Sequence, residues 1–457
     1  MITHPCTRLP SLVLLASLTA CAWHNYTPAP VDLPKAAQAD SERSLDDQSV
    51  LAALNAKGHD TSGWPDLLWS RETLTSAMLN IHPQQRAMRA KVVQVRAQWQ
   101  SELSTKSPEL SSTLEHHSQT GDGKNSPWAV GAGLQWELTQ PAVQNALQNV
   151  AELEIQEAQL AAGESAWRLY RALGTALLER HLCTERLRLT QSGLDLAIAR
   201  DKSMQVRARY GVASALEVQQ SAQRLQDARR ELAQAQAAHT AALTQLATAL
   251  AVPYERINNI RIADWPSFVT VQANEARALA LNNQLELARE RLQYELAEAQ
   301  LRLQVAKQFP NIKLGPGLLW SQGDSVWQFG LSLPATLLHR NQPAIRAAET
   351  KRSAQAAQLL AKQAEIINEV ERLRLNALSL VEPLRIAQTA LQAAQSQVQL
   401  VNAQFDAGNV DALSVIDTKG LQWQAQRAVF DAQASLLQAQ WALELALQSP
   451  LSSAPLK

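Results

Sequence analysis

The sequence contains one structural unit twice, and this duplication constrains the fold more than any other feature does. A shift of 202 residues superposes four single positions and one motif: Asn80 on Asn282, Arg89 on Arg291, Ala97 on Ala299, Pro108 on Pro310, and Gln140-Pro141-Ala142-Val143 on Gln342-Pro343-Ala344-Ile345. A shift of 197 residues superposes five more: Gly211 on Gly408, Leu216 on Leu413, Val218 on Val415, Ala228 on Ala425 and Leu250 on Leu447. Solenoid repeats span about 20–50 residues. Residues 70–262 and 270–450 are therefore predicted to be two copies of one larger unit.

Each copy is predicted to begin with a helix, over 84–106 and 275–307, followed by two short strands and two long helices. The long helices are rich in Ala, Gln, Leu, Glu and Arg, which favour helix, and no proline lies between residues 142 and 251. The first long helix is predicted over 142–205, which is about 95 Å at about 1.5 Å per residue, and its return over 213–250. The second copy is predicted over 344–405, with a kink at Pro383, and over 411–447.

Two related stretches interrupt the long helices, Gly211-Val212-Ala213-Ser214 and Gly408-Asn409-Val410-Asp411. Glycine tolerates positive φ, so each stretch is predicted to be a turn between antiparallel helices. Small and apolar residues form a seam along the returning helix: Ala222, Leu225, Ala228, Leu232, Ala235, Leu243, Leu246 and Leu250. The seam lets helices approach closely, while Gln, Arg and Glu cover the other faces. Periodicity alone also fits an antiparallel coiled coil with a scaffolding role.

Short segments in each copy alternate between apolar and polar residues, as membrane strands do. Residues 128–138 place Trp128, Val130, Ala132, Leu134, Trp136 and Leu138 on one face, and Ala129, Gly131, Gly133, Gln135 and Glu137 on the other. In the second copy, one strand groups Ile312, Leu314, Leu318 and Trp320, and the next groups Trp327, Phe329, Leu331 and Leu333. A weaker pattern over 110–117 predicts the fourth strand.

A soluble sandwich is the first explanation of such alternation, but it does not explain four strands in two distant pairs. Strands of about 9–11 residues with aromatic ends fit a transmembrane barrel. Four strands cannot close one, because bilayer barrels need at least about eight strands and no free edge. If these strands span a membrane, several chains must share the barrel.

The first 21 residues carry the features of a secretory signal and a lipid-attachment cysteine. Arg8 gives a weakly positive start, and residues 12–18 form an apolar run shorter than the about 20 residues that span a bilayer. Leu18-Thr19-Ala20-Cys21 resembles a bacterial lipobox, which implies cleavage before Cys21 and its acylation, including palmitate. Ala22 after the cysteine implies passage to the outer membrane. The alternative is an ordinary signal peptide with a chance cysteine.

The remaining composition predicts no enzyme, cofactor, metal site or nucleic-acid interface. The 42 basic and 42 acidic residues leave no net field to attract nucleic acid. Cys183 is the one cysteine left after Cys6 and Cys21, and its apolar neighbours predict a packing role. The neighbours His116 and His117 point to opposite faces of a strand. Residues 121–126 lack the spacing of a phosphate loop and are predicted to be a turn.

The duplicated plan resembles the TolC-like outer-membrane efflux protein family, in its lipoprotein branch. Features shared with the family occur in order in both copies: Asn80 and Asn282 before a helix, Pro108 and Pro310 at strand entry, Trp128 to Gly131 and Trp327 to Gly330, and a glycine-led tip followed by Leu-x-Val. Asn25-Tyr26-Thr27-Pro28 matches the family's start. The resemblance covers nearly all of the mature chain.

The resemblance implies a mainly α protein with a membrane β-barrel, assembled as a homotrimer. Four strands from each copy would close a twelve-stranded outer-membrane barrel with a lumen lined by Gln135, Glu137 and Lys313. The long helices would continue it as a periplasmic α-helical barrel, and segments near 45–75, 255–275 and the C-terminus would form a collar. The domains expected are a signal peptide (1–20), a lipid-anchored and equatorial segment (21–70), the first repeat (71–262), and the second repeat with a C-terminal tail (263–457).

The function implied is passive conduction of small molecules from an inner-membrane pump and a periplasmic adaptor to the exterior. The resemblance assigns adaptor contact to the tips: Gly211, Val212, Ala213, Ser214, Gly408, Asn409, Val410 and Asp411. It assigns the periplasmic gate to Glu217 and Asp417, whereas Ser414 departs from the acidic pattern. For both acids, a solvated helix N-terminus is the simpler explanation. The alternative function is a non-conducting structural coiled-coil lipoprotein of the envelope. The cargo is not determined by the sequence.

Overall fold

The computed structural model describes residues 26–104, 106–117, 126–257, 260–263, 265, 271–309, 311–321, 324–332 and 340–450. The chain divides into two units, Met1–Arg43 and Ser44–Lys457. The described part of the first unit contains helix α2 (Leu33–Glu42), whose N-cap Asp32 accepts a hydrogen bond from the Lys35 N–H at 3.0 Å. The predicted signal and the proposed lipid site at Cys21 lie outside the described residues.

Within the second unit, the two repeats contain equivalent elements in the same order, except that the one long helix of the first repeat is divided into two in the second. The first repeat consists of α4 (Arg71–Ile81), α5 (Pro83–Glu102), β2 (Glu109–His116), β3 (Trp128–Leu138), α6 (Pro141–Arg209) and α7 (Ala215–Leu250). The second consists of α8 (Ala273–Asn283), α9 (Leu285–Ala306), β5 (Ile312–Ser321), β6 (Asp324–Ser332), α11 (Gln342–Ser379), α12 (Val381–Asp406) and α13 (Ala412–Leu447). The duplication predicted from the sequence is confirmed.

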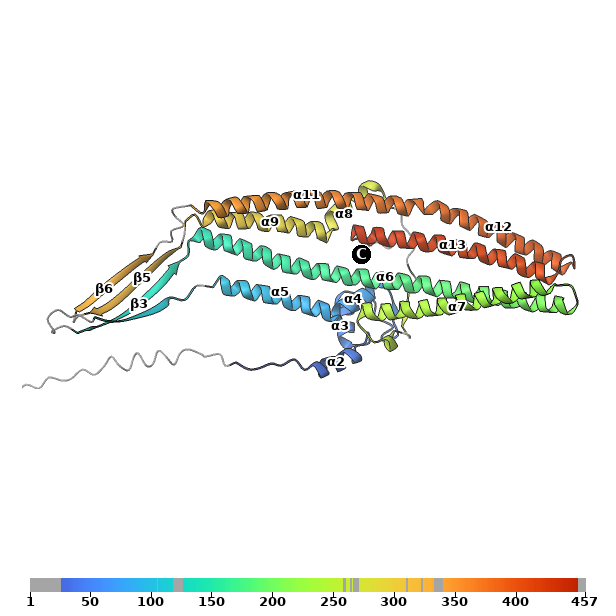
Figure 1. Cartoon of the computed structure of the whole chain (residues 1–457), viewed down its shortest axis with the longest axis horizontal. Coiled ribbons are helices and arrows are strands. Elements are labelled where there is room, and N and C mark those ends of the chain that lie inside the picture. The colour runs from blue at the N-terminus through green and yellow to red at the C-terminus, as the bar shows by residue number, and fades with distance from the viewer. Residues whose placement is uncertain are drawn as a thin grey trace, which may run out of the picture. The chain divides into compact units, whose positions relative to one another are not determined.

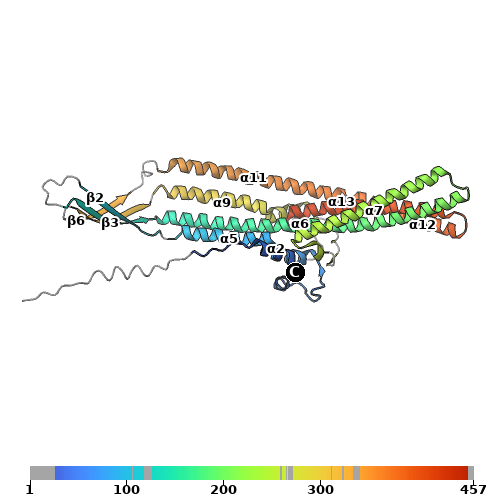
Figure 2. The same cartoon turned by 60° about the horizontal axis from the view of Figure 1, so that its bottom comes forward.

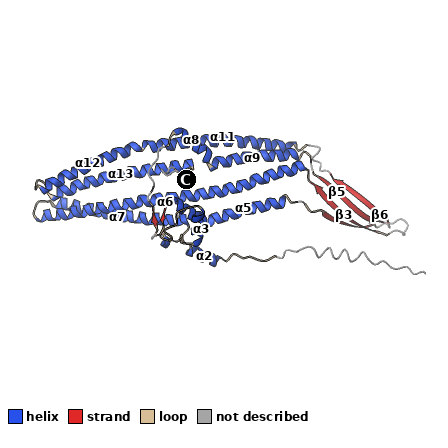
Figure 3. Cartoon of the chain, turned by 180° about the vertical axis from the view of Figure 1, so that it is seen from behind, coloured by secondary structure: helices blue, strands red, loops and turns tan. Residues whose placement is uncertain are grey.

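The sheet and the helix turns lie at opposite ends of this unit (Figures 1 and 2). The helices α5, α6, α9 and α11 extend from the sheet toward the middle, and α6, α7, α12 and α13 continue to the far end. Helix α6 covers most of the distance alone, because its 69 residues span about 100 Å at about 1.5 Å per residue. Figure 3 shows strands at the sheet end and in one small pair near the middle.

Small elements from separate parts of the sequence meet near the middle of the second unit. They are α3 (Gln48–Ala56), β1 (Leu68–Trp69), α4, the short helix η2 (Tyr254–Arg256) and β4 (Arg261–Ile262), which pairs in parallel with β1. Their apolar side chains pack with α6 and α7 in one core that includes Leu54, Trp69, Leu74, Met78, Leu173, Leu246, Leu250 and Ile257. This arrangement brings together the segments near 45–75 and 255–275 that were expected to form a collar.

The helix predicted over 275–307 is wrong as a single element, because α8 and α9 are separated at Gln284, where the backbone is extended. The equivalent break in the first repeat is His82, and there Pro83 disfavours helix at the preceding residue. No proline marks the second break. Instead, the Gln284 amide donates to the carbonyl of Ala446, and the Leu285 N–H donates to Gln448 Oε1 at 3.0 Å. Contacts with the end of α13 therefore accompany a break that has no local signal.

The kink predicted at Pro383 is confirmed, and it divides the long helix into α11 and α12 at Leu380. Proline lacks an N–H and its ring clashes with the carbonyl four residues earlier. Here that carbonyl belongs to Ser379, the last residue of α11. The seam predicted on α7 is also confirmed, since none of its eight residues is exposed. Among the described residues, no helix is both long enough and apolar enough to cross a membrane.

The four strands form one antiparallel sheet in the order β2-β3-β5-β6. Strands β3 and β5 join the two repeats, with Val130 opposite Trp320 and Glu137 opposite Lys313. Within the described residues, β2 and β6 each have a strand on one side only. The two repeats thus share a sheet whose outer edges are unpaired.

Candidate functional site

The two helix–turn–helix tips have the same backbone geometry. Gly211 and Gly408 follow the last helical turns of α6 and α12 with φ of +70° and +75°. The N–H of Val212 donates to the Arg207 carbonyl at 2.9 Å, and that of Asn409 donates to the Gln404 carbonyl at 2.8 Å. These are the six-to-one hydrogen bonds of a Schellman motif, in which glycine takes the left-handed position. The predicted turns are confirmed, together with the reason for their glycines.

The helices that leave the tips are capped by the same two types of side chain in exchanged positions. In the first tip, Ser214 is the N-cap of α7, and Glu217 accepts hydrogen bonds from the Ser214 N–H at 2.7 Å and hydroxyl at 2.9 Å. In the second tip, Asp411 is the N-cap of α13, and it accepts from the Ser414 N–H at 2.9 Å and hydroxyl at 2.6 Å. Ser414 is the equivalent of Glu217 in the second repeat. There the acid of the capping pair is the N-cap residue itself, Asp411.

Hydrogen bonding stabilises the charged form of both capping acids. The Ser214 N–H and hydroxyl lower the pKa of Glu217. The Ser414 hydroxyl and N–H, with a smaller contribution from Arg207, lower the pKa of Asp411. An acid near a helix N-terminus is also favoured by the helix dipole. Glu217 therefore serves first as part of a capping box, the simpler role considered for it above.

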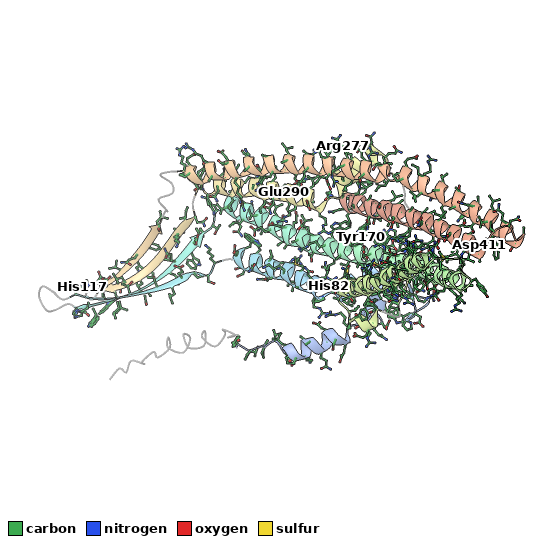
Figure 4. All side chains as sticks on the ribbon, turned by 45° about the vertical axis from the view of Figure 1, so that its right-hand side comes forward. His82, His117, Tyr170, Arg277, Glu290 and Asp411 are labelled. Carbon is green, nitrogen blue, oxygen red and sulfur yellow. The ribbon has the colours of Figure 1, made fainter. Side chains whose placement is uncertain are left out.

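Two ion pairs connect the first tip to the second. Arg207 of α6 pairs with Asp411, the N-cap of α13, and Arg200 of α6 pairs with Asp417, which lies less than two turns into α13. All four side chains are partly exposed, between 25% and 47%. Figure 4 shows Asp411 at the end of the helices and His117 at the opposite end, beyond β2. The structure thus brings Asp417 to the α6–α13 contact, whereas Glu217 remains exposed on α7.

A groove of about 490 Å³ lies beside these ion pairs, between α6, α7 and α13. Its charged lining comes from all three helices: Arg200, Arg224, Asp227, Glu231, Asp417 and Arg427. Burial and the neighbouring Arg224 lower the pKa of Arg200. The Arg427 guanidinium lies 5.1 Å from the centre of the Trp423 ring and 3.2 Å from Glu231. Two ion pairs, Arg200–Asp417 and Arg427–Glu231, therefore lie in the wall of a groove whose lining is otherwise largely apolar.

One buried layer below the tips distinguishes the two hairpins. Asp201 and Ser221 are buried in the first hairpin, and their equivalents at the 197-residue shift are Val398 and Thr418, which are buried in the second. The Thr418 hydroxyl donates to the Ser414 carbonyl at 2.7 Å. By contrast, the Ser221 hydroxyl and one Asp201 oxygen have no hydrogen-bond partner among the described residues, while the other Asp201 oxygen accepts from the Gln205 amide at 2.7 Å. The first hairpin therefore buries a carboxylate where the second buries valine.

Two tryptophans that were not predicted as important pack against glycines in the middle of α6. Trp423 donates to the Leu189 carbonyl at 2.8 Å, and a Cβ on Gly193 would lie 2.5 Å from its ring. A Cβ on Gly174 would lie 2.2 Å from the ring of Trp441. The excess of tryptophan, 12 against 5 Phe and 5 Tyr, together with glycine inside a long helix, is the signal that would have found these contacts.

At the other end of the unit, the sheet has one apolar and one polar face. The cross-strand register places Leu114, Val130 and Trp320 side by side, and Ser112, Ala132, Leu318 and Trp327 in the next row. Large apolar side chains on this face are exposed in the single chain, among them Phe329 at 82% and Leu110 at 77%. The opposite face carries Glu109, Thr113, Glu115, Gln135, Glu137, Lys313 and Gln328, with Gly131, Gly133, Gly315, Gly317 and Gly330 between them. The predicted alternation is confirmed.

Comparisons with known proteins match both repeats and the fold. The family model described as outer membrane efflux protein matches residues 74–252 and 276–448. A membrane protein from Pseudomonas aeruginosa is similar in structure, with a TM-score of 0.67 and 18% identity over 82% of this chain and 93% of that one. The outer membrane protein VceC from Vibrio cholerae has a TM-score of 0.66 and 16% identity, over 84% and 97% of the two chains. The open state of the Neisseria gonorrhoeae MtrE outer membrane channel has a TM-score of 0.62 and 17% identity, over 85% and 91%. No curated protein sequence matches the chain.

Proposed function

The chain belongs to the outer membrane efflux protein family, and from this premise we propose that three copies of it form the exit duct of a tripartite efflux system. The duct passively conducts small molecules that an inner-membrane pump and a periplasmic adaptor deliver. No catalytic role is assigned to any residue. No observation favours the alternative of a non-conducting envelope lipoprotein.

One observation carries this proposal: a four-stranded sheet with an exposed apolar face and with two edges that no other described strand pairs. Backbone groups at a sheet edge have no hydrogen-bond partner in a bilayer, so a membrane sheet must close on itself. Four strands are too few, and three copies provide twelve, an even number in the range of outer-membrane barrels. The apolar face then contacts lipid, and the polar face lines the lumen. Glycines on the inner face leave that lumen wide.

The helix tips form the end that docks the adaptor. Val212 is 61% exposed beside Gly211, and the equivalent turn around Gly408 presents Asn409 and Val410. Because Schellman bonds and N-caps fix both turns, the two tips present rigid surfaces of the kind that bind with little loss of conformational entropy. The adaptor-contact residues remain Gly211, Val212, Ala213, Ser214, Gly408, Asn409, Val410 and Asp411.

The gate is closed by the ion pairs that join the tips. Partly exposed pairs of this kind contribute roughly 0–1 kcal/mol each, so docking of a partner can break them at small cost. Asp417 acts through Arg200, and Asp411 acts through Arg207. Glu217 contributes a charged ring at the same end while it caps α7.

Lipid on Cys21 anchors the N-terminus in the outer membrane, with the helices in the periplasm. The sequence around Cys21 supports this part of the proposal.

Planar-bilayer conductance and native mass spectrometry of the full chain test the function together. A trimer that forms steady ion-conducting channels is expected, both for the native chain and for Cys21→Ser, because the anchor is separate from the barrel. A monomer that is extracted without detergent after Cys21→Ser and does not conduct would contradict the duct.

A further inference from the structure

The second repeat contacts the first through β5 on β3 and through α9 and α13 on α6, and the Ala-rich parts of the α13–α6 contact specify its register weakly. The two helices are antiparallel: Tyr170 contacts Glu444, Thr175 contacts Trp441, Leu189 contacts Trp423, and Arg207 contacts Asp411. Between these contacts α13 is rich in Ala and Gln. Small residues pack similarly when one helix slides by a turn along another, so the large and charged side chains of the interface must select one register.

One candidate is a buried charge pair at the far end of α13 from the tips. Arg71, at the start of α4, lies 2.8 Å from Glu444 of α13, and their side chains are only 7% and 3% exposed. The Tyr170 hydroxyl donates to Glu444 at 3.0 Å, and burial raises the pKa of this tyrosine, so it stays a donor. Figure 4 places Tyr170 near the middle of the unit, far from the tip at Asp411.

Three aromatic rings enclose the guanidinium of Arg71. Its Cζ lies 5.4 Å from the ring centre of Trp265, 5.6 Å from Trp441 and 5.9 Å from Tyr170. The electron-rich faces of the rings favour a cation at the centre of this box. Its members come from α4, α6, α13 and the segment that links the two repeats, so the box joins both repeats and their linking segment.

The box occurs once per chain rather than once per repeat. At the 202-residue shift the equivalent of Arg71 is Ala273, and at the 197-residue shift the equivalent of Glu444 is Ala247. The equivalent helices, α8 and α7, therefore have no charged side chain at these two positions. The Arg71–Glu444 pair therefore marks the contact of the second repeat with the first. The duplication produces no second copy of this contact.

We propose that Arg71 and Glu444, in their aromatic box, are positioning residues that set the register of α13 on α6 and thereby the level of one tip relative to the other. A slip of one heptad would leave both charges buried without a partner, which is strongly disfavoured. It would also move Trp441 from Gly174 onto Trp167 or His181. The same slip would displace Gly408 from the level of Gly211 by about 10 Å. Docking of an adaptor by the two tips rests on the proposed function, whereas the register of α13 on α6 does not.

Cross-linking within the full-length trimer tests this register. The background carries Cys183→Ala, and a short bismaleimide joins cysteine pairs within one chain. Arg207→Cys with Asp411→Cys reports the observed register, and Arg207→Cys with Thr418→Cys reports a slip of one heptad toward the tip. The key variant is R71M/E444M, which removes both charges and keeps most of their volume. The matched control is R385M/E382M, an exposed ion pair within α12.

For R71M/E444M we expect a trimer in which the ratio of slipped to native cross-link rises at least about tenfold. The control R385M/E382M and the cation-conserving R71K keep the native ratio. Exchange of the charges in R71E/E444R also slips, because a carboxylate is repelled by the ring faces. A native ratio in R71M/E444M overturns the proposal. Loss of its trimer overturns it as well, since the pair would then be needed for stability and not for register. These results do not depend on conduction or export, so they stand apart from the test of the duct.

Discussion

Arg207, in the last turn of α6, forms an ion pair with Asp411, the N-cap residue of α13, so the two tips of one chain are joined side chain to side chain. The duplication made the two turns predictable but not this link between them. In the second tip one carboxylate both caps a helix and binds the neighbouring hairpin. In the first tip the N-cap is Ser214, and the carboxylate of Glu217 completes its capping box instead of pairing with the other hairpin.

Substitution of Arg207 tests whether this link holds the tips together. R207Q removes the ion pair and leaves Asp411 free to cap α13. A partly exposed pair contributes roughly 0.2–1 kcal/mol, so we expect the open fraction in planar-bilayer recordings to rise by about 1.5- to 5-fold. R385Q, which removes an exposed pair within α12, is the control. Equal conductance for R207Q and R385Q would show that the link does not restrain the tips.

The closed tip is expected to lose stability only in acid. The Ser414 hydrogen bonds lower the pKa of Asp411 from an ordinary 3.8, and Arg207 lowers it further; only the contribution of Arg207 is lost when the two tips separate. A carboxylate with a depressed folded-state pKa contributes its full stability above its unfolded pKa and loses it as the pH falls through the folded value. Bilayer conductance should therefore be constant from about pH 8 to about pH 5 and rise below about pH 4. The variant D411N should conduct at neutral pH as the native channel does in acid. A rise that begins near pH 6 would point to histidine instead.

Removal of the buried carboxylate in the first hairpin should stabilise the protein. D201V places at this position the residue that the second repeat has at Val398. It removes one carboxylate oxygen that has no hydrogen-bond partner among the described residues, and one that accepts a single bond from Gln205 of the same helix. A buried unsatisfied polar group costs about 1–3 kcal/mol, so the free energy of unfolding should rise by up to that amount. The reverse substitution V398D should lower it. Denaturant unfolding followed by circular dichroism measures both, and destabilisation by D201V would show that the bond from Gln205 outweighs the cost of burying the carboxylate.

A charge on either tip should prevent docking without affecting assembly. V212D and V410D place a carboxylate on the surface assigned to the adaptor, outside the helix seams. Cells that depend on this channel should lose resistance to exported compounds, while native mass spectrometry still shows the trimer. The control V93D adds the same charge to an exposed position on α5, far from the tips. Normal export by both tip variants would show that the adaptor binds elsewhere.

Much of the fold could be predicted because it follows from local patterns. Alternation from Trp128 to Leu138 predicted β3 at the bounds observed, since period-two patterning is a property of a strand alone. Gly211 and Gly408 predicted both turns, because a positive φ at the end of a helix favours glycine. The kink beside Pro383 followed from the missing N–H.

Contacts between distant segments had no such local pattern. The break at Gln284 is accompanied by hydrogen bonds to the end of α13, more than 160 residues later. The partner of Glu444 is Arg71, and neither residue differs in sequence context from the many exposed charges of the helices. Trp441 and Gly174 were each unusual, but nothing in the sequence paired them.

The sequence by itself determined two copies of a strand-pair and helix-hairpin unit, the inner and outer faces of the strands, and the positions of both turns. Each of these depends on residues that are close in the chain, where backbone preferences and side-chain periodicity act directly. Only the tertiary structure decided that Asp411 pairs with Arg207, that Asp201 occupies a buried layer, and that Arg71 meets Glu444 among three rings. Those outcomes depend on which helices lie side by side and in which register, and similar Ala-rich surfaces allow many such pairings until buried charges and tryptophans select one.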